Sequence, residues 1–245
     1  MTDKILQGKN AIVTGGSRGI GRAIAEALAG EGMDLYLVCH SNIEMLNELA
    51  DKLSRRYSIR CHTFSGDVSD SEFIDKVFSG IDSLDVLINN AGISHIGLLQ
   101  DMTNEEWNKV INTNLTGVFY CCRAAIPLML ASHSGRIINI SSMWGSVGAS
   151  MEVAYSTTKG GMNSFTKALA KELAPSHIVV NAIACGVIDT DMNSCFSDEE
   201  MSDLIDDIPI GRLGKPSEVA QVVLELASAP EYMTGQIIGM DGGYI

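Results

Sequence analysis

Tyr155 and Lys159 are spaced for joint chemistry in the segment Tyr155-Ser156-Thr157-Thr158-Lys159. On a helix, residues four positions apart lie on the same face. A tyrosine hydroxyl can donate a proton to a carbonyl oxygen, and a neighbouring ammonium group favours the phenolate that remains. This spacing is common by chance, so the pair indicates acid–base chemistry only if other residues support it.

A glycine-rich segment, residues 14–21, follows the first apolar run of the chain. Glycines in a strand-to-helix turn let the backbone approach a pyrophosphate, and the helix N-terminus favours the anion. The spacing G-x-x-x-G-x-G differs from the general dinucleotide fingerprint, so an ordinary tight turn is the alternative interpretation. Its place before the first expected helix favours dinucleotide binding. The candidate cofactor-binding residues are Gly15, Ser17, Arg18, Gly19, Ile20 and Gly21.

The choice between NAD and NADP depends on the end of the second expected strand. In the general fold, an acidic residue about 20 positions after the glycine turn binds the ribose 2′-hydroxyl and selects NAD. Here the strand ends in Val38-Cys39-His40-Ser41-Asn42, without a carboxylate. Arg18 could pair with a 2′-phosphate, and His40 is a weaker candidate. We therefore expect NADP(H), the alternative being that both side chains face solvent.

Apolar runs rich in β-branched residues alternate with longer segments of helical periodicity. The runs are residues 11–14, 35–38, 61–64, 86–89, 136–140, 178–183 and 236–240, and the helical segments include 19–31, 43–57, 105–132 and 155–173. Continuous apolar strands, each followed by a helix, predict a parallel sheet with helices on both faces. We expect one α/β domain over residues 1–245, with a doubly wound, Rossmann-like sheet of seven strands that binds ligands at their carboxyl ends.

The composition limits the partners. The 245 residues include 30 acidic and 17 basic side chains, for a formal net charge of −13. Such a chain binds polyphosphates and anionic surfaces poorly, so neither nucleic acid nor a membrane is an expected partner. The longest uninterrupted apolar runs are shorter than the about 20 residues that span a bilayer, and the start shows no secretory pattern. The six cysteines form no metal-binding pair. We expect a cytoplasmic protein without a metal, whose thiols are free and mostly buried.

Over essentially its whole length, the chain resembles the short-chain dehydrogenase/reductase family. The matching motifs, in order, are the glycine turn at Thr14, Asp67-Val68, Asn89-Asn90-Ala91-Gly92, Asn114, Ser142, Tyr155 with Lys159, and Ile188-Asp189-Thr190. The resemblance implies an NAD(P)-dependent oxidoreductase that is commonly a homotetramer.

The resemblance also implies the roles of the matching catalytic residues. Tyr155 is the implied general acid, and Lys159 is implied to lower the pKa of this tyrosine by roughly 3 units and to hold the ribose. Ser142 is implied to bind the substrate carbonyl, and Asn114 to hold a proton-relaying water. The implied cofactor contacts are Asp67, Val68, Asn90, Ala91 and Gly92, with the backbone of Ile188 at the nicotinamide.

Cys185 departs from the family pattern, which has proline before Gly186. Proline fixes φ and lacks an N–H group, so we expect the loop beside the nicotinamide to be more mobile in this chain. Nothing basic is adjacent in the sequence to activate the thiol, so Cys185 is not expected to be a nucleophile.

Within the family, the chain looks like the 3-oxoacyl-[acyl-carrier-protein] reductases. Members that serve the carrier protein have arginines where this chain has His133 and Ser176, and an acidic surface would dock an acidic carrier poorly. Residues 94–98, 144–153 and 207–213 are similar to reductases of the 5-aminopentanone group on elongation factor P. In that interpretation Glu152 pairs with the substrate amine. The alternative is an acidic residue favoured by the helix dipole.

Several functions therefore stay open. The chain is expected to be an NADPH-dependent ketone reductase, possible substrates being modified elongation factor P, a carrier-protein thioester, a hydroxysteroid or a small ketone. A non-catalytic NADP-binding scaffold is the alternative from another class. The complete set Asn114, Ser142, Tyr155 and Lys159 argues against the scaffold, which has no need for a proton relay.

Overall fold

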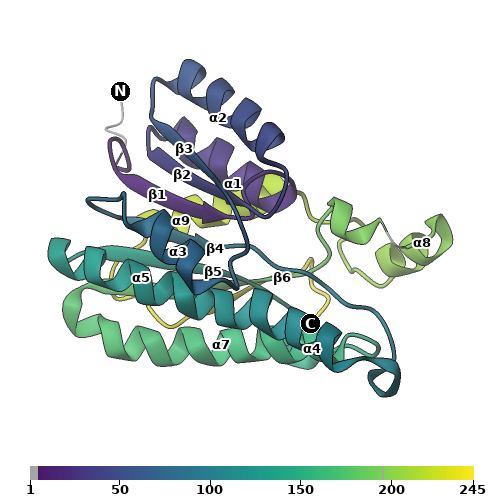
Figure 1. The fold of residues 1–245 in the computed structure, drawn as a ribbon. Helices are drawn as coiled ribbons and strands as arrows, with labels where there is room; N and C mark the ends of the chain where they lie inside the picture. Colours follow the sequence, from purple (N-terminus) through teal and green to yellow (C-terminus); the bar gives the residue numbers. More distant parts are fainter. Residues whose placement is uncertain (1–4, 195) are drawn as a thin grey trace.

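A computed structural model describes residues 5–194 and 196–245 and contains one parallel sheet (Figure 1). In space the strands follow the order β3-β2-β1-β4-β5-β6-β7. Their bounds are β1 Asn10–Thr14, β2 Asp34–Cys39, β3 Cys61–Ser65, β4 Val86–Asn89, β5 Gly135–Ser142, β6 Ile178–Cys185 and β7 Ile237–Met240. The predicted doubly wound α/β sheet is confirmed, because each expected strand lies within a residue or two of its observed bounds.

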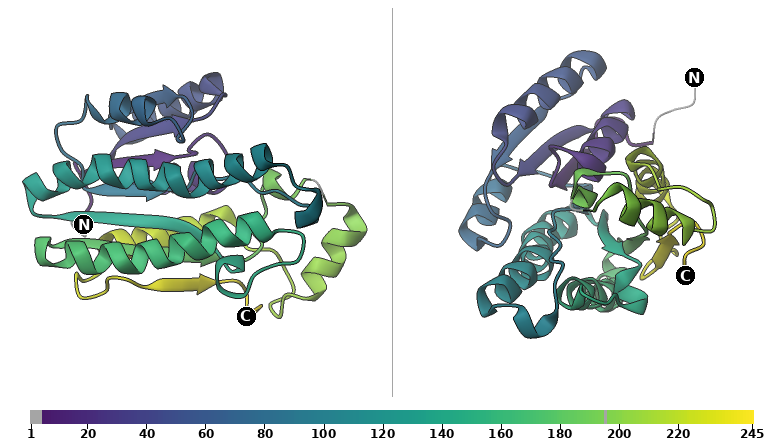
Figure 2. Two further views of the ribbon diagram at one scale, coloured as in Figure 1. Left: turned by 60° about the horizontal axis from the view of Figure 1, so that its bottom comes forward. Right: turned by 90° about the vertical axis from the view of Figure 1, so that its right-hand side faces the viewer.

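Helices cover both faces of this sheet (Figure 2). One face packs against α1 (Gly19–Gly30), α2 (Ile43–Tyr57) and α9 (Pro216–Ser228). The other packs against α3 (Ser71–Phe78), α5 (Gly117–Ser132) and α7 (Val153–Leu173). The remaining elements are the α-helices α4 Asn104–Ile111, α6 Trp144–Val147 and α8 Asp198–Asp206, the π-helical turn η2 Asn112–Thr116, and the 3-10 turns η1 Leu99–Asp101, η3 Ala174–Ser176 and η4 Asp191–Asn193.

The helices start and end as their sequences dictate. The side chain of Asn42 accepts a hydrogen bond from the amide of Met45 and begins α2, and Ser58 ends this helix in the left-handed conformation. Leu46, Leu49, Ala50 and Leu53 form its buried stripe. Such amphipathic helices hold the strands in place, so the loops at the strand ends can carry functional groups.

The strand order reverses between β1 and β4. β1 pairs with β2 on one side and β4 on the other, so successive crossovers leave the sheet in opposite directions at this point. A crevice for a ligand forms at the carboxyl ends of the strands where the order reverses. The glycine turn after β1 and Asn90 after β4 lie at this point.

Residues 104–132 run as one helical stretch through α4, the π-helical turn and α5. By length and composition alone, this stretch in the described part of the chain could cross a bilayer. The sequence prediction concerned uninterrupted apolar runs, which stay short within this stretch because polar residues such as Asn114 and Arg123 interrupt it. In the fold, Val118, Cys121 and Ala125 bury one side of the stretch against the sheet, while Phe119 and Leu130 are exposed.

The cysteines fit the expectation of free thiols where the structure describes them. Cys39, Cys121, Cys122 and Cys185 are free and buried, and Cys61 is free and half-buried. Cys195 and residues 1–4 lie outside the described residues.

Candidate active site

Helix α7 places Tyr155 and Lys159 on one face, as their spacing predicts. The side chain of Lys159 is buried, and its Nζ donates a hydrogen bond of 2.8 Å to the carbonyl oxygen of Ile140 on β5. The same nitrogen lies 5.5 Å from the centroid of the Tyr155 ring. The lysine is therefore fixed between the end of β5 and the tyrosine.

Burial shifts both groups away from their charged forms. Loss of water lowers the pKa of Lys159 to about 8 and raises the pKa of Tyr155, which a hydrogen bond with Ser142 lowers in part. The predicted net lowering of the Tyr155 pKa is not found in this structure, because desolvation of the phenolate and the nearby acidic groups Glu152 and Cys185 outweigh the hydrogen bond with Ser142. Tyr155 is accordingly protonated near neutral pH, which is the form that can donate a proton.

Ser142 reaches the tyrosine from the last position of β5. Its side chain is buried, and its Oγ accepts a hydrogen bond of 3.2 Å from the amide of Trp144. Ser142 also pairs in register with Cys185, the last residue of β6. A hydroxyl group is thus held beside Tyr155 at the carboxyl ends of two central strands.

Asn114 is buried in the π-helical turn and joins three segments. Its Nδ2 donates to the carbonyl oxygen of Ile93 at 2.8 Å and to Oγ1 of Thr158 at 3.2 Å. Its Oδ1 accepts from the amide of Ile93 at 2.8 Å. A Cβ atom added at Gly92 would lie 3.3 Å from Asn114 Oδ1 and 3.7 Å from Lys159 Nζ. Asn114, Gly92 and Lys159 are therefore neighbours, and the side chain of Asn114 fixes the loop after β4 against α7.

The glycine turn is packed closely against the end of β4. Gly15 has φ +67°, and a Cβ atom at Gly21 would collide with the carbonyl oxygen of Gly15 and the side chain of Asn90. The Nδ2 of Asn90 donates to the carbonyl oxygens of Thr14 at 2.9 Å and Gly15 at 3.1 Å. Only glycine fits at these two positions.

Thr14 organises this turn, a role that the sequence did not reveal. Its Oγ1 accepts hydrogen bonds of 3.0 Å from the amides of Asn90 and Ala91. These contacts link β1 to the loop after β4.

The crevice fits a dinucleotide. Arg18 is the N-cap of α1 and makes no side-chain capping hydrogen bond, so the first amides of the helix are available to a pyrophosphate. Ser17 and Ile20 lie half-buried beside them. A bare backbone without side chains at Gly15 and Gly21 leaves room for the phosphates.

Arg18 and His40 have acidic neighbours. The Nη1 of Arg18 lies 3.5 Å from Oδ2 of Asp191, with both side chains about 70% exposed. The Nε2 of His40 lies 3.9 Å from Oδ2 of Asp67. Asp67 also accepts a hydrogen bond of 2.8 Å from the amide of Ser69. Arg18 is thus accessible and only weakly paired, and His40 and Asp67 form a separate pair at the ends of β2 and β3.

The segment after β6 closes the other side of the crevice. Ile188 is buried and forms a β-bridge with Gly214, and its carbonyl oxygen accepts from Nδ2 of Asn193 at 2.7 Å. A Cβ atom at Gly19 would lie 3.2 Å from Thr190, so this segment lies against the glycine turn. Val68 is instead buried in the core near Gly117, so its side chain has a packing role.

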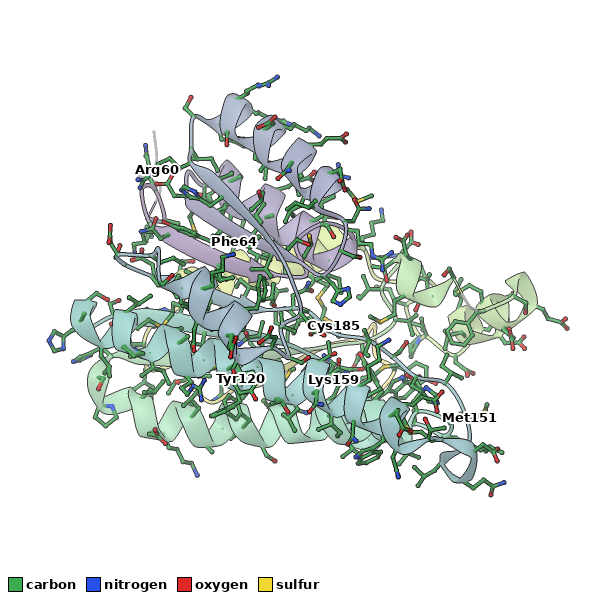
Figure 3. All side chains as sticks on the ribbon, in the orientation of Figure 1. Arg60, Phe64, Tyr120, Met151, Lys159 and Cys185 are labelled. Carbon is green, nitrogen blue, oxygen red and sulfur yellow. The ribbon has the colours of Figure 1, made fainter. Side chains whose placement is uncertain are left out.

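Cys185 belongs to β6 itself. It pairs with Ser142 on one side and Met240 on the other, and its carbonyl oxygen accepts from the amide of Met143 at 2.8 Å. The prediction of a more mobile loop therefore does not apply to Cys185, which is held in a ladder on both sides. Cys185 lies in the same region as Lys159 (Figure 3). Burial raises the pKa of the thiol to about 12, although the charge of Lys159 lowers it in part. The thiol is not an activated nucleophile.

Comparisons with known proteins agree with this geometry. Residues 9–201 match the family model described as short chain dehydrogenase. The chain is 43% identical over 243 residues to a protein of Aquifex aeolicus named 3-oxoacyl-[acyl-carrier-protein] reductase FabG, which covers 97% of this chain and 98% of the relative. It is 41% identical over 238 residues to the uncharacterized oxidoreductase YmfI of Bacillus subtilis, covering 96% and 98%.

A solved structure also superimposes closely on the fold. It is described as a putative NAD(P) dependent gluconate 5-dehydrogenase from Beutenbergia cavernae with bound NADP at low occupancy. The TM-score is 0.93 at 30% identity, over 99% of this chain and 98% of that one.

Proposed function

Because the chain belongs to the short-chain dehydrogenase family and is an NAD(P)-dependent oxidoreductase of 3-oxoacyl-[acyl-carrier-protein] reductase type, we propose that it reduces a ketone with NADPH. One observation carries this proposal. Ser142 and Lys159 flank a protonated Tyr155 at the carboxyl ends of β5 and β6, on the crevice that the glycine turn borders.

Each residue of the site has a separate role in the proposed reaction. The bound cofactor supplies the hydride. Ser142 hydrogen-bonds the substrate carbonyl oxygen, and Tyr155 donates its phenolic proton to that oxygen as negative charge develops there. Lys159 stabilises the resulting phenolate and holds the ribose hydroxyls. Asn114 places the loop after β4 against α7 and supports the water that returns a proton through Lys159.

The preference for NADPH rests on Arg18. The arginine is accessible beside the first turn of α1, where a 2′-phosphate can form a charge-assisted hydrogen bond with it. Asp67, which follows β3, faces His40 and the amide of Ser69. The remaining cofactor contacts we propose are Asn90, Ala91 and Gly92 after β4 and the backbone of Ile188.

We propose the 5-aminopentanone group on elongation factor P as the substrate, with a carrier-protein β-ketothioester as the second candidate. The similarity of residues 144–153 and the net charge of −13 favour a cationic substrate on a basic protein. The second candidate is favoured by relatives named 3-oxoacyl-[acyl-carrier-protein] reductase.

His133 and Ser176 stand where reductases that serve the carrier protein have arginines. Their positions in the fold make this difference weaker evidence against a carrier-protein substrate than the sequence indicates. His133 precedes β5 and Ser176 precedes β6, so both residues lie at the amino ends of these strands. β5 and β6 each have 8 residues, and a strand rises about 3.3 Å per residue. Both positions are therefore separated from Ser142 by the length of a strand, which is roughly 25 Å. These positions therefore do not line the active site of their own chain.

A comparison of kcat/KM values decides between the candidate substrates. The purified protein with NADPH is assayed with ketone-modified elongation factor P, a simple aminoketone, a small neutral ketone and a β-ketoacyl carrier protein. We expect the highest kcat/KM for the modified elongation factor or the aminoketone. A higher kcat/KM for the carrier-protein thioester would assign the chain to fatty-acid synthesis instead, and no NADPH oxidation with any ketone would overturn the proposed reaction.

We also propose that the protein is a homotetramer and cytoplasmic. Phe119 and Leu130 are exposed on α5 although they lie in a strongly apolar stretch. An apolar helix face of this kind is stabilised when a second copy covers it. Light scattering of the purified protein gives the mass directly, and a monomer at micromolar concentration would contradict the tetramer.

A further inference from the structure

The C-terminal segment packs onto the segment that follows Ser142. The rings of Tyr244 and Trp144 form an edge-to-face contact, with centroids 5.6 Å apart and planes at 87°. Gly242 is held in turn by its carbonyl oxygen, which accepts a hydrogen bond of 3.1 Å from the amide of Ile210. Its φ of +70° and the adjacent side chain of Ile208 leave room only for glycine. Gly242 and Tyr244 are therefore each held by contacts with other segments of the chain.

Trp144 connects this contact to a carboxylate. Its side chain lies near enough to the carboxyl group of Glu152, the N-cap residue of α7, to lower the pKa of that group. Glu152 makes no side-chain capping hydrogen bond to its own helix, so only its charge favours the start of α7. The carboxylate is half-buried beside the indole.

Glu152 lies beside the reacting tyrosine and has no cation to balance it. It is three residues before Tyr155 on the same helix, and its charge acts on Tyr155. Among the ion pairs of the described residues, none includes Glu152. Burial raises its pKa, which the neighbouring side chain of Trp144 lowers in part. A half-buried carboxylate that lacks a cationic partner gains free energy when a ligand supplies one.

Lys159 does not serve as that partner. Lys159 follows Tyr155 by four residues, whereas Glu152 precedes it by three. At 1.5 Å of rise per residue, the two charges are about 10 Å apart along the helix axis, which is about one Debye length. The ammonium of Lys159 is bonded to Ile140 instead. The two sides of Tyr155 thus carry opposite charge, and no ion pair of the described residues balances the negative side.

We propose that Glu152 is a specificity-determining residue that binds the cationic group of an amine-bearing ketone, and that Trp144 and Tyr244 are the positioning residues that aim its carboxylate. This inference rests on the proposed reduction of an amine-bearing ketone and adds the residues that select this substrate. It also gives the C-terminal segment a part in substrate selection, because removing the Tyr244 ring frees Trp144 and so releases Glu152.

Two matched ketones test the proposal. The cationic probe is a methyl ketone with a trimethylammonium group three methylenes from the carbonyl, and the neutral probe is its tert-butyl isostere. The quantity measured is the ratio of their kcat/KM values with NADPH. We expect the wild type to prefer the cationic ketone. Glu152→Gln should reduce this ratio about two- to fivefold, which corresponds to the free energy of a partly exposed ion pair.

The positioning residues are tested by how KM and kcat change. Trp144→Phe keeps an aromatic ring but loses the indole N–H, and Tyr244→Ala removes the ring contact. Both should raise KM for the cationic ketone more than for the isostere, with kcat for the cationic ketone changing less than KM. Matched controls are Tyr232→Ala, at a fully exposed tyrosine, and Glu172→Gln, at an exposed glutamate near the other end of α7. These controls should leave the ratio as in the wild type.

Binding can be measured without turnover. In a Trp107→Phe background, Trp144 is the remaining tryptophan, and its fluorescence reports occupancy beside Glu152. We expect a saturable change with the cationic ketone that Glu152→Gln weakens, and a smaller change with the isostere. If this binding occurs without NADPH oxidation, the ketone reduction is wrong and the cation site stands. If Glu152→Gln weakens both ketones equally, or the cationic ketone produces no saturable change, the cation site is wrong.

Discussion

The ammonium nitrogen of Lys159 lies 5.5 Å from the centroid of the Tyr155 ring. This distance is within the range of a cation–π contact, so the lysine stabilises the ring as well as any negative charge that forms on it. Lys159 is held there by the carbonyl oxygen of Ile140, and its burial makes the charge costly. The predictions below follow from this arrangement and from the crevice beside it.

Tyr155→Phe should abolish most turnover while NADPH still binds. The phenylalanine keeps the ring packing and removes the hydroxyl group that donates the proton. The loss expected for a general acid is about 10²- to 10⁴-fold in kcat. Steady-state kinetics with a good ketone substrate, together with NADPH binding by fluorescence, provide the check. Retention of most of the activity would mean that another group supplies the proton.

Lys159→Met should stabilise the fold while it damages function. Burial lowers the pKa of Lys159 from 10.5 to about 8. Between these values the unfolded chain binds more protons than the folded one, so this group makes the free energy of unfolding rise with pH. Below about pH 8 the charged lysine costs roughly 3 kcal/mol, and methionine removes this cost but loses the hydrogen bond to Ile140, leaving a gain of about 1–3 kcal/mol.

The measurement is urea unfolding of the wild type and Lys159→Met at about pH 7 and about pH 10. The stability gain of the variant should shrink as the pH rises. Its kcat and its affinity for NADPH should both fall, because Lys159 holds the ribose as well as the charge. A variant that is less stable than the wild type at both pH values would show that the lysine is not strained by burial.

Arg18→Gln should weaken NADPH binding by about 1–3 kcal/mol and leave NADH nearly unchanged, since only NADPH carries the 2′-phosphate. Asp191→Asn is the matched partner variant. It frees Arg18 from a carboxylate 3.5 Å away that also opposes the phosphate, so NADPH should bind tighter by up to about 1 kcal/mol. Dissociation constants of both cofactors are compared by titration. Equal losses of NADPH and NADH in Arg18→Gln would exclude a role for Arg18 in reading the phosphate.

Gly21→Ala should disrupt the cofactor crevice. The added methyl group would collide with the carbonyl oxygen of Gly15 and with the side chain of Asn90, so the turn and the end of β4 would have to separate. Both NADPH and NADH should bind much more weakly, and the protein should lose about 1–3 kcal/mol of stability, as for overpacking. Gly80→Ala, where an added Cβ atom would meet no atom within 4 Å, is the control. Unchanged cofactor affinity in Gly21→Ala would contradict the close packing.

The sequence alone determined the sheet, the glycine turn and the Tyr155–Lys159 face. These features depend on short-range patterns: apolar strands, helical spacing and glycine where the backbone must bend. The position of a residue just after a strand also placed Asn90 and Ser142 at the carboxyl ends of the sheet, because all strands of a parallel sheet end on the same side.

Only the tertiary structure decided the charges and the long-range contacts. The direction of the Tyr155 pKa shift depends on how much water the surrounding elements remove, and sequence spacing does not record this. The remote positions of His133 and Ser176 became evident only from the strand directions. Tyr244 contacts Trp144 across 100 residues of sequence, since β7 returns the chain to the sheet beside β6. Local patterns fix each element, but desolvation and contacts between distant segments arise only when all elements pack together.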